Sequence, residues 1–300
     1  MKKILLTLMF VSFLNANSQN PVQEFNFNGN LSSADNTISF LGTPVFVNDR
    51  MGTAKGALRL SNKAFQAVVG DLPQGNKPRT ISVWIKFNAV ATANNVLGYG
   101  TAANAQYFGL VQQASAGGNS EISLEGWGSG NDVAVSAPLI KDIWYMYSIT
   151  YDGSTSKIYR NGELLKSVEG ISRLTKGYIL SIGKVNTATS INADIDDIKL
   201  YTVAMTDEQV REAYNSSKPN GASVTETVPA SNANVTNTVK KTIAAPAKTP
   251  APAAALPETN KSGKIIEVFS QGRQIMSANA SNITDLPEGT YLIKVINSKK

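Results

Sequence analysis

The sequence predicts an all-β protein, an antiparallel β-sandwich with one short helix near its C-terminal end. Two observations carry this prediction. Short segments in which apolar and polar residues alternate recur between residues 21 and 201, with turn-forming Asn, Asp and Gly between them. One later segment, from residue 206, has a helical signature instead. Many short strands at close spacing are typical of an antiparallel sandwich or barrel.

The strand predictions rest on alternation and on turn chemistry. Residues 80–87 alternate polar and apolar side chains with the period of two expected of a half-buried strand. Residues 144–151 are a longer apolar and aromatic run that ends at Asp152-Gly153. Asn161-Gly162 supplies the two positive-φ residues of a type I′ turn between two alternating segments. Residues 157–166 are therefore predicted to form a β-hairpin.

The predicted helix begins after Thr206, which can cap it. Gln209 lies three residues later and completes a capping box, and Met205 and Val210 are placed as a hydrophobic staple. We expect this helix to end near Tyr214.

Composition divides the chain into four parts. Residues 1–18 combine two lysines, an apolar run too short to span a bilayer and small residues at Ala16 and Ser18, which is the pattern of a signal peptide. The sandwich occupies residues 19–215. Residues 216–262 are rich in Pro, Ala and Thr and lack aromatic residues, so they predict a disordered linker. Strand patterns return in residues 263–300, a small C-terminal β segment.

Composition also excludes several classes of function. The chain has no Cys and no His, which excludes disulfides, thiol nucleophiles, His-ligated zinc and Ser–His–Asp catalysis. The net charge of +6 lies outside the sandwich, since residues 19–215 carry 16 basic and 17 acidic residues. Nucleic-acid binding needs basic charge on the folded module, so we expect no nucleic-acid partner. No later segment predicts a transmembrane helix in the mature chain.

The order of several motifs resembles the laminin-G-like, concanavalin A-like lectin/glucanase domains. The closing motif is the most specific: a strand with paired acids, Ile195-Asp196-Asp197-Ile198, leads into a short capped helix. Ala193 departs from the family, which usually has Gly there. The resemblance covers about two thirds of the chain and implies a jelly-roll sandwich. The other matching stretches are residues 27–30, 52–60, 80–87 and 144–162.

A second resemblance concerns the C-terminal segment. Residues 268–275, Leu286-Pro287-Glu288-Gly289 and the terminal Lys299-Lys300 are similar to the C-terminal half of a type A sorting domain of the type IX secretion system. The usual N-terminal half of such a domain, with its Pro-Asn-Pro stretch, is missing. The alternative is therefore an appended hairpin that has no role in sorting. The resemblance implies export to the cell surface or the medium, with the type IX machinery as a partner.

The paired acids raise the question of a metal. On a regular strand Asp196 and Asp197 point to opposite faces, so we expect no catalytic pair there. Related sandwiches hold a structural calcium where the last strand meets the first. By that resemblance Asp196 would supply the carboxylate, and Asn28 and Asn30 would supply further oxygen ligands. The alternative is a pair of solvated or salt-bridged carboxylates. No cofactor is required.

Residues 121–125 carry the enzyme hypothesis. Alternation places Glu121, Ser123 and Glu125 on one face of a strand, and two carboxyl groups are what glycoside hydrolysis requires. The stretch resembles the Glu-x-Asp-x-Glu strand of laminarinase-type enzymes, but Ser123 replaces the middle Asp. The two backbones also lie roughly 13 Å apart on an extended strand. We therefore expect no catalysis, with Glu121 and Glu125 as the candidates if it exists.

Trp127 is the stronger candidate for binding. It lies in a glycine-rich loop, Glu125-Gly-Trp-Gly-Ser-Gly-Asn131, where an exposed aromatic face could stack on a sugar. Asn131 and Asp132 would bond sugar hydroxyls, and Tyr99 beside another loop is a further candidate. The alternative is a Trp folded back onto the sheet. Trp84 and Trp144 lie in strand patterns and are predicted to be core.

These observations favour a secreted or cell-surface recognition module that binds a glycan or a surface glycoprotein. Two alternatives remain: a structural or adhesive surface protein with a protein partner, and a glycoside hydrolase acting on β-glucans.

Overall fold

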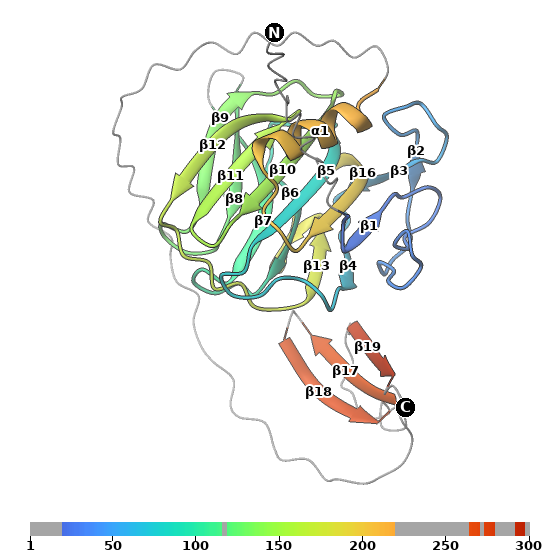
Figure 1. The fold of residues 1–300 in the computed structure, drawn as a ribbon. Helices are drawn as coiled ribbons and strands as arrows, with labels where there is room; N and C mark the ends of the chain where they lie inside the picture. The colour runs from blue at the N-terminus through green and yellow to red at the C-terminus, as the bar shows by residue number, and fades with distance from the viewer. Residues whose placement is uncertain (1–19, 116–118, 220–263, 271–272, 280–291, 298–300) are drawn as a thin grey trace, which may run out of the picture.

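Two antiparallel β-sheets stack against each other and form the body of the protein (Figure 1). The structure is a computed structural model and describes residues 20–115, 119–219, 264–270, 273–279 and 292–297. The predicted leader and most of the predicted linker lie outside these residues. The antiparallel sandwich predicted from the sequence is confirmed.

The first sheet has eight strands. They are β1 (Gln23–Phe25), β2 (Phe46–Val47), β3 (Ala57–Ser61), β5 (Arg79–Phe87), β10 (Trp144–Tyr151), β11 (Thr155–Arg160), β12 (Glu163–Glu169) and β16 (Asn192–Tyr201). Their order is β12-β11-β10-β5-β16-β3-β2, and β1 also pairs with β16. The last strand of the sandwich is thus held between β5 and strands from the N-terminal end.

The second sheet has six strands in the order β4-β13-β6-β7-β8-β9. They are β4 (Phe65–Val68), β6 (Asn94–Gly100), β7 (Tyr107–Ala114), β8 (Asn119–Glu125), β9 (Val133–Pro138) and β13 (Ile179–Ile182). A two-stranded ribbon, β14 (Lys184–Val185) and β15 (Ala188–Thr189), follows β13. The loop that joins β8 to β9 carries three predicted binding residues, Trp127, Asn131 and Asp132, whereas Tyr99 lies within β6.

The main core lies between the two sheets. Its members are the inward-facing apolar residues of both, such as Ile85 and Tyr147 from the first sheet and Phe108 and Leu124 from the second. Alternation along β8 buries Ile122 and Leu124 in this core and leaves Glu121 and Glu125 on the outer face. The predicted placement of the two glutamates on one face is therefore confirmed.

The helix α1 (Asp207–Ser217) covers part of the outer face of the eight-stranded sheet (Figure 1). Its predicted capping box is present, with Thr206 and Gln209 bonding each other's backbone N–H. The staple residues Met205 and Val210 are buried in one cluster with Trp84. The helix ends at Ser217 rather than near Tyr214.

The two strand tryptophans differ in their environments. Trp84 is buried as predicted, although it packs under the helix and not between the sheets. Trp144 is only partly buried, so its prediction as a core residue is wrong. Its ring lies at the margin of the helix cluster, where the Lys86 ammonium sits 5.3 Å from the ring centroid. An amphipathic environment of this kind suits a Trp at the end of a strand.

The predicted hairpin is confirmed at Asn161-Gly162. Both residues have positive φ, 53° and 81°, and Arg160 pairs directly with Glu163 across the turn. The C-terminal segment also forms strands, β17 (Lys264–Ser270), β18 (Arg273–Asn279) and β19 (Leu292–Asn297), in the order β18-β17-β19.

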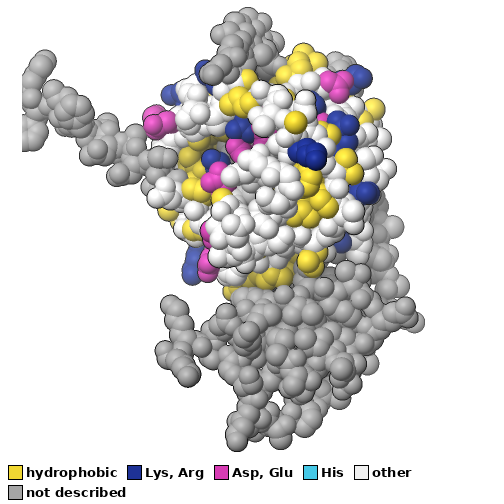
Figure 2. Space-filling model, turned by 90° about the vertical axis from the view of Figure 1, so that its right-hand side faces the viewer, with side chains coloured by type: hydrophobic (Ala, Val, Ile, Leu, Met, Phe, Trp, Pro, Cys, Tyr) yellow, Lys and Arg dark blue, Asp and Glu magenta, His cyan; other side chains and the backbone are white. Residues whose placement is uncertain are grey.

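Charge on the sandwich is mixed. On the side shown in Figure 2, which carries the N-terminal strands, basic and acidic side chains are interspersed among uncharged ones. This distribution agrees with the near-neutral balance of residues 19–215. Among the described residues, no helix is long and apolar enough to cross a membrane.

Candidate functional site

Three loops are joined by backbone hydrogen bonds into one surface. The three-loop cluster comprises residues 101–106, 126–132 and 171–177. The amide of Ala105 donates to the carbonyl of Trp127 at 2.9 Å, and the amide of Leu174 donates to the carbonyl of Ala105 at 2.8 Å. Ala105 thus links the other two loops. Leu174 is 54% exposed and Trp127 is partly exposed, and both residues bond to Ala105.

The backbone of Trp127 adopts a conformation that bulky residues rarely accept, with φ of 67°. Four hydrogen bonds hold it there. Oδ1 of Asp132 accepts from the amides of Gly126 at 2.7 Å and Trp127 at 3.3 Å. The carbonyl of Trp127 accepts from Ala105 and, at 2.8 Å, from the Asn131 side chain. Strained residues that persist because their surroundings over-determine them cluster at functional sites, which marks this Trp as a candidate.

Asn131 and Asp132 have a structural role in addition to the predicted one. The Asn131 amide nitrogen donates both to the Trp127 carbonyl and to Oδ1 of Asn104, at 2.8 Å each. One oxygen of Asp132 is engaged by two backbone amides. Both side chains hold the loop that presents Trp127. Their remaining oxygens, together with the exposed Ser129, are what the cluster offers to a ligand.

Glu125 lies at the start of the same loop and is partly buried. The hydroxyl of Ser123 donates to its carboxylate at 2.8 Å. Burial is the main cause that raises the pKa of Glu125 to about 7, followed by the negative charge of Asp132. Glu121 adds a smaller repulsion. The cluster therefore holds a carboxyl group that titrates near neutral pH.

A buried arginine lies beneath the loop. Arg173 has no exposed surface, and its Nε donates to the Ser156 hydroxyl at 3.0 Å while Nη1 donates to the Asn131 carbonyl at 3.3 Å. Nη2 has no hydrogen-bond partner among the described residues. Burial lowers the pKa of Arg173 to about 10, so it stays charged at neutral pH. Local sequence does not indicate this residue, because its partners lie far away in the chain.

Tyr99 is not available to a ligand, so its prediction as a binding residue is wrong. It is 1% exposed and packs against Phe108 inside the sandwich. Its hydroxyl donates to the Pro73 carbonyl at 2.8 Å and accepts from Arg79 at 3.1 Å. Burial raises its pKa to about 12. The alternation of β6 points Gly98 outward and Tyr99 inward, and the flanking loop does not change this.

The paired acids Asp196 and Asp197 bind the same arginine. The prediction that they point to opposite faces is wrong, because β16 has a bulge here and Asp197 takes a φ of 42°. Arg50 donates from Nη1 to Asp196, from Nη2 to Asp197 at 2.6 Å and from Nε to the Ser217 carbonyl at 2.8 Å. Its guanidinium also lies 5.0 Å from the centroid of the Trp84 ring.

This arrangement fits a resident guanidinium better than calcium. Arg50 already places a positive charge against both carboxylates, and a metal ion beside it would be repelled. Asn30 is engaged in a local turn, where its Oδ1 accepts from the Ser32 amide at 2.9 Å and its Nδ2 donates to the Asn28 carbonyl at 3.4 Å. Among residues 20–115 and 119–219, no group of three or more acidic side chains could hold a metal.

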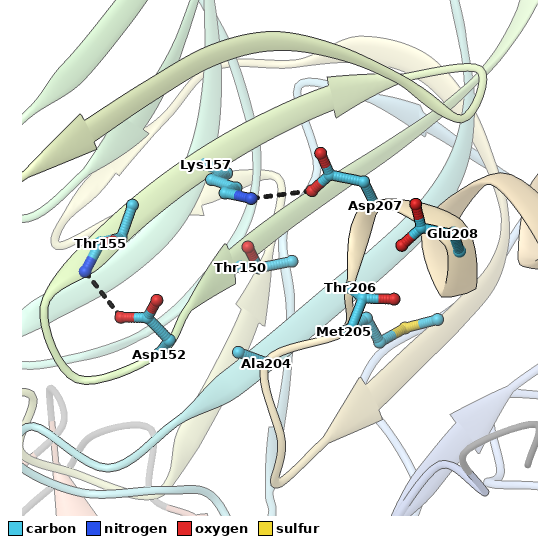
Figure 3. A pocket seen from close by; sticks show the side chains of 9 residues that line it. All are labelled: Thr150, Asp152, Thr155, Lys157, Ala204, Met205, Thr206, Asp207 and Glu208. Carbon is cyan, nitrogen blue, oxygen red and sulfur yellow. Dashed lines mark hydrogen bonds and ion pairs between the residues drawn. The ribbon is translucent and has the colours of Figure 1, made fainter.

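A second surface feature is a polar cavity of about 320 Å³ on the outer face of the eight-stranded sheet (Figure 3). Lys157 from β11 reaches across it to Asp207 at the start of α1, at 2.7 Å, and Thr150 lies between them on the floor. The Tyr159 hydroxyl donates to the same Asp207 oxygen at 2.8 Å. Lys157, Tyr159 and Asp207 satisfy one another, so the cavity is a weaker candidate than the three-loop cluster.

Comparison with known families identifies the fold. Residues 61–211, 151 of the 300, match the family model of the concanavalin A-like lectin/glucanases superfamily. The chain belongs to this superfamily. No curated protein sequence matches it significantly.

Solved structures of similar fold include binding domains. Domain 4 of AbnA, a GH43 extracellular arabinanase from Geobacillus stearothermophilus solved in complex with arabinotriose, aligns with a TM-score of 0.52 and 19% identity over 64% of this chain and 97% of that domain. The botulinum neurotoxin serotype D binding domain aligns with a TM-score of 0.50 and 14% identity over 66% of this chain. The chain spans about half of the toxin domain, 51%. At these levels of identity, the similarities show a shared fold and nothing more.

The fold thus brings together four of the residues selected from the sequence: Glu125, Trp127, Asn131 and Asp132. It separates them from Tyr99 and from Asp196, which belong to the core and to the Arg50 cluster. Sequence reasoning missed Asn104 and Arg173. For Asn104 a weak signal existed, since it lies in a small-residue loop of the kind that often carries binding residues.

Proposed function

We propose that the protein is a glycan-recognition module that binds its ligand at the three-loop cluster, with Trp127 as the stacking platform. The observation that carries this proposal is the strained backbone of a partly exposed Trp, which makes three hydrogen bonds and is supported by a fourth at Gly126. A rigid aromatic face costs little entropy on binding, and it matches the apolar face of a sugar ring.

The surroundings of Trp127 supply polar groups of the right kind. Ser129 and Asp132 are exposed on the same loop, and Asn104 lies beside it. Hydroxyl, amide and carboxylate groups around an aromatic face are what a polyhydroxylated ligand requires. The arabinotriose complex of AbnA domain 4 supports the proposal by analogy of fold. The ligand class we propose is an oligosaccharide or the glycan of a surface glycoprotein.

The test is binding of the full chain to a glycan array, followed by titration of the best ligand. Trp127→Ala should abolish binding or weaken it by about 1–3 kcal/mol, the usual range for a lost stacking contact. Trp144→Ala is the matched control, since Trp144 is another partly exposed Trp but lies at the helix margin. Equal effects of both substitutions, or full binding by Trp127→Ala, would refute the assignment.

Glycoside hydrolysis is the second candidate, because a carboxyl group with a pKa near 7 suits a general acid. Against it, the Glu125 carboxylate accepts from Ser123 and lies near the negative charge of Asp132, whereas hydrolases hold their two carboxyl groups at least about 5 Å apart. We therefore propose binding without catalysis. Release of reducing sugar from β-glucans by the wild type, lost in Glu125→Gln, would reverse this choice.

We also propose that the protein acts outside the cell. The support is the signal-peptide pattern of residues 1–18 and the resemblance of residues 263–300 to a type IX sorting segment. Fractionation of the producing cells, with and without residues 263–300, tests this part separately from ligand binding.

A further inference from the structure

The third loop of the cluster is an extended segment with one exposed face. Its side chains alternate: Ser172, Leu174 and Lys176 are exposed, whereas Arg173 and Thr175 are buried. Successive side chains of an extended segment point to opposite faces, which explains this alternation. The segment therefore presents a continuous face to solvent, with the apolar side chain of Leu174 in its middle.

Hydrogen bonds join this extended segment to a loop on either side of it. The amide of Leu174 donates to the carbonyl of Ala105 on one side, and the carbonyl of Thr175 accepts from the amide of Gly75 at 2.7 Å on the other. Backbone groups of successive residues in an extended segment bond in opposite directions. A fourth loop, residues 70–77, thus continues the three-loop cluster beyond the third loop.

The bonds also set the length of this combined surface. From Trp127 the path runs through Ala105 and the third loop to Gly75, and each of its three steps is a backbone hydrogen bond. Segments that are bonded side by side lie about 4.8 Å apart, so the backbones of Trp127 and Gly75 are separated by roughly 14 Å.

A buried arginine holds the fourth loop in one conformation. Arg79 is 1% exposed, and its guanidinium donates to three carbonyls of the loop, those of Pro73, Gly75 and Lys77. The side-chain amide of Gln74 fastens the loop to the backbone of Gly177, with bonds of 2.7 and 2.9 Å. A loop that is ordered before binding loses little conformational entropy when a ligand arrives.

A polar cavity of about 340 Å³ lies beside the fourth loop. Its lining includes Asp71 and Lys77 of this loop, Tyr178 directly after the third loop and Thr202 after β16. The Asp71, Lys77 and Thr202 side chains are exposed, and Tyr178 is partly exposed. An aromatic ring beside carboxylate, ammonium and hydroxyl groups suits a sugar, as at Trp127. Small-ligand pockets measure about 300–1,000 Å³, so this cavity suits part of an oligosaccharide.

We propose that this cavity is a second subsite of the glycan site, and that the ligand is a linear oligosaccharide that stacks on Trp127, crosses Leu174 and enters the cavity beside Tyr178. The inference rests on the proposed function, because it extends the site at Trp127. Roughly 14 Å exceeds the width of one sugar ring, so a monosaccharide reaches only one of the two subsites. The exposed Leu174 supplies the apolar contact between them.

The first experiment measures affinity as a function of ligand length. The full chain is titrated with arabino-, xylo- and cello-oligosaccharides, each from the monosaccharide to the hexasaccharide, and with the best array glycan and its shorter fragments. For a series that binds, we expect affinity to rise by about tenfold or more from the disaccharide to the hexasaccharide, because only the longer chain engages both subsites at once. Equal affinity at all lengths would overturn the proposal.

The second experiment changes the cavity while leaving Trp127 in place. Lys77→Ala and Asp71→Ala each remove a polar contact, and each should weaken binding of the hexasaccharide by about 2- to 10-fold without changing binding of the disaccharide. Thr202→Trp fills the cavity and should reduce hexasaccharide affinity to that of the disaccharide. All three positions are exposed, so the variants should keep the melting temperature of the wild type.

Two comparisons make this experiment specific. Trp127→Ala should weaken binding of both the short and the long probes, because both lengths use the stacking platform. Lys63→Ala is the matched control for Lys77→Ala, since Lys63 is also exposed but precedes β4, at the opposite end of that strand from the fourth loop. Equal losses in the two lysine variants would overturn the proposal.

The second subsite and the proposed function fail in different ways. Full binding of the long probes by the three cavity variants, with loss in Trp127→Ala, overturns the second subsite and leaves the proposed function standing. Loss in the cavity variants, with full binding by Trp127→Ala, refutes the proposed function and the continuous site, and leaves the cavity as a site of its own. A wild type that binds neither the array nor any probe refutes both.

Discussion

Removal of Arg50 should destabilise the sandwich more than any exposed substitution, because three segments meet at this side chain. It bonds Asp196 and Asp197 on the β16 bulge and the carbonyl of Ser217 at the end of α1. The side chain of Arg50 is 9% exposed and that of Asp196 is 3% exposed. Arg50→Ala therefore leaves a buried carboxylate without a counter-charge.

The expected cost follows from the burial of the pair. Breaking a buried ion pair by removing one partner typically costs about 3–5 kcal/mol. For a domain of this size that loss lowers the melting temperature by about 6–20 °C. Burial and the charge of Asp197 already raise the pKa of Asp196 to about 7, and Arg50 opposes that rise. Without Arg50 the pKa rises further, so the variant should lose stability as pH increases from about 4 and should recover part of it in acid.

Urea denaturation at acid and neutral pH measures both effects. Lys141→Ala is the control, because the Lys141–Asp142 pair is exposed, at 66% and 59%, and should contribute at most about 1 kcal/mol. Asp196→Ala should cost less in the Arg50→Ala background than in the wild type, by about 0.5–3 kcal/mol of coupling. A loss below about 1 kcal/mol in Arg50→Ala, equal to that of the control, would refute the reasoning.

The same variant addresses calcium. If Arg50 is the resident cation, millimolar calcium should not raise the melting temperature of the wild type, whereas Arg50→Ala should gain stability from calcium through its two freed carboxylates. A calcium-dependent shift in the wild type, removed by chelator, would contradict this and restore the metal site predicted from the sequence.

Three further predictions concern the helix cap and the binding loop. Thr206→Ala should lower the free energy of unfolding by about 0.5–2 kcal/mol because it removes the N-cap, and Thr206→Ser should restore it in the same denaturation assay. The pKa of Glu125 in the folded state is about 7, above its ordinary value of 4.5, so folding takes up a proton between these pH values. The free energy of unfolding of the wild type should therefore fall as the pH rises from 4.5 to about 7 and level off above that. Glu125→Gln should have a smaller slope than the wild type in urea titrations across the range, and the part of the slope that comes from Asp196 should remain. Gly126→Ala should weaken glycan binding at least as much as Trp127→Ala. The added Cβ would clash with the Asn131 carbonyl and lie 2.5 Å from Nη1 of Arg173, which disturbs the loop. Unchanged binding would show that the loop tolerates the shift.

Part of the candidate site was predictable from local sequence. The Trp127 loop is too rich in glycine to bury a large side chain securely, and the loop indeed leaves Trp127 partly exposed. The alternation of residues 121–125 correctly placed Glu121 and Glu125 on one face. What the pattern did not indicate is that Asp132 holds the backbone amides of Gly126 and Trp127, because these bonds form only when the loop between β8 and β9 closes on itself.

The sequence by itself determined the features that depend on a few neighbouring residues: the sandwich class from alternation, the Asn161-Gly162 turn, and the cap formed by Thr206 and Gln209. These arise from backbone conformation and from hydrogen bonds over two to four residues. Only the tertiary structure decided the role of Arg50, which lies 146 residues from Asp196, and the place of Arg173 beneath the binding loop. Such contacts depend on strand register and on a single bulge, and a bulge reverses the direction of a side chain without any change in the hydrophobic pattern that predicts the strand.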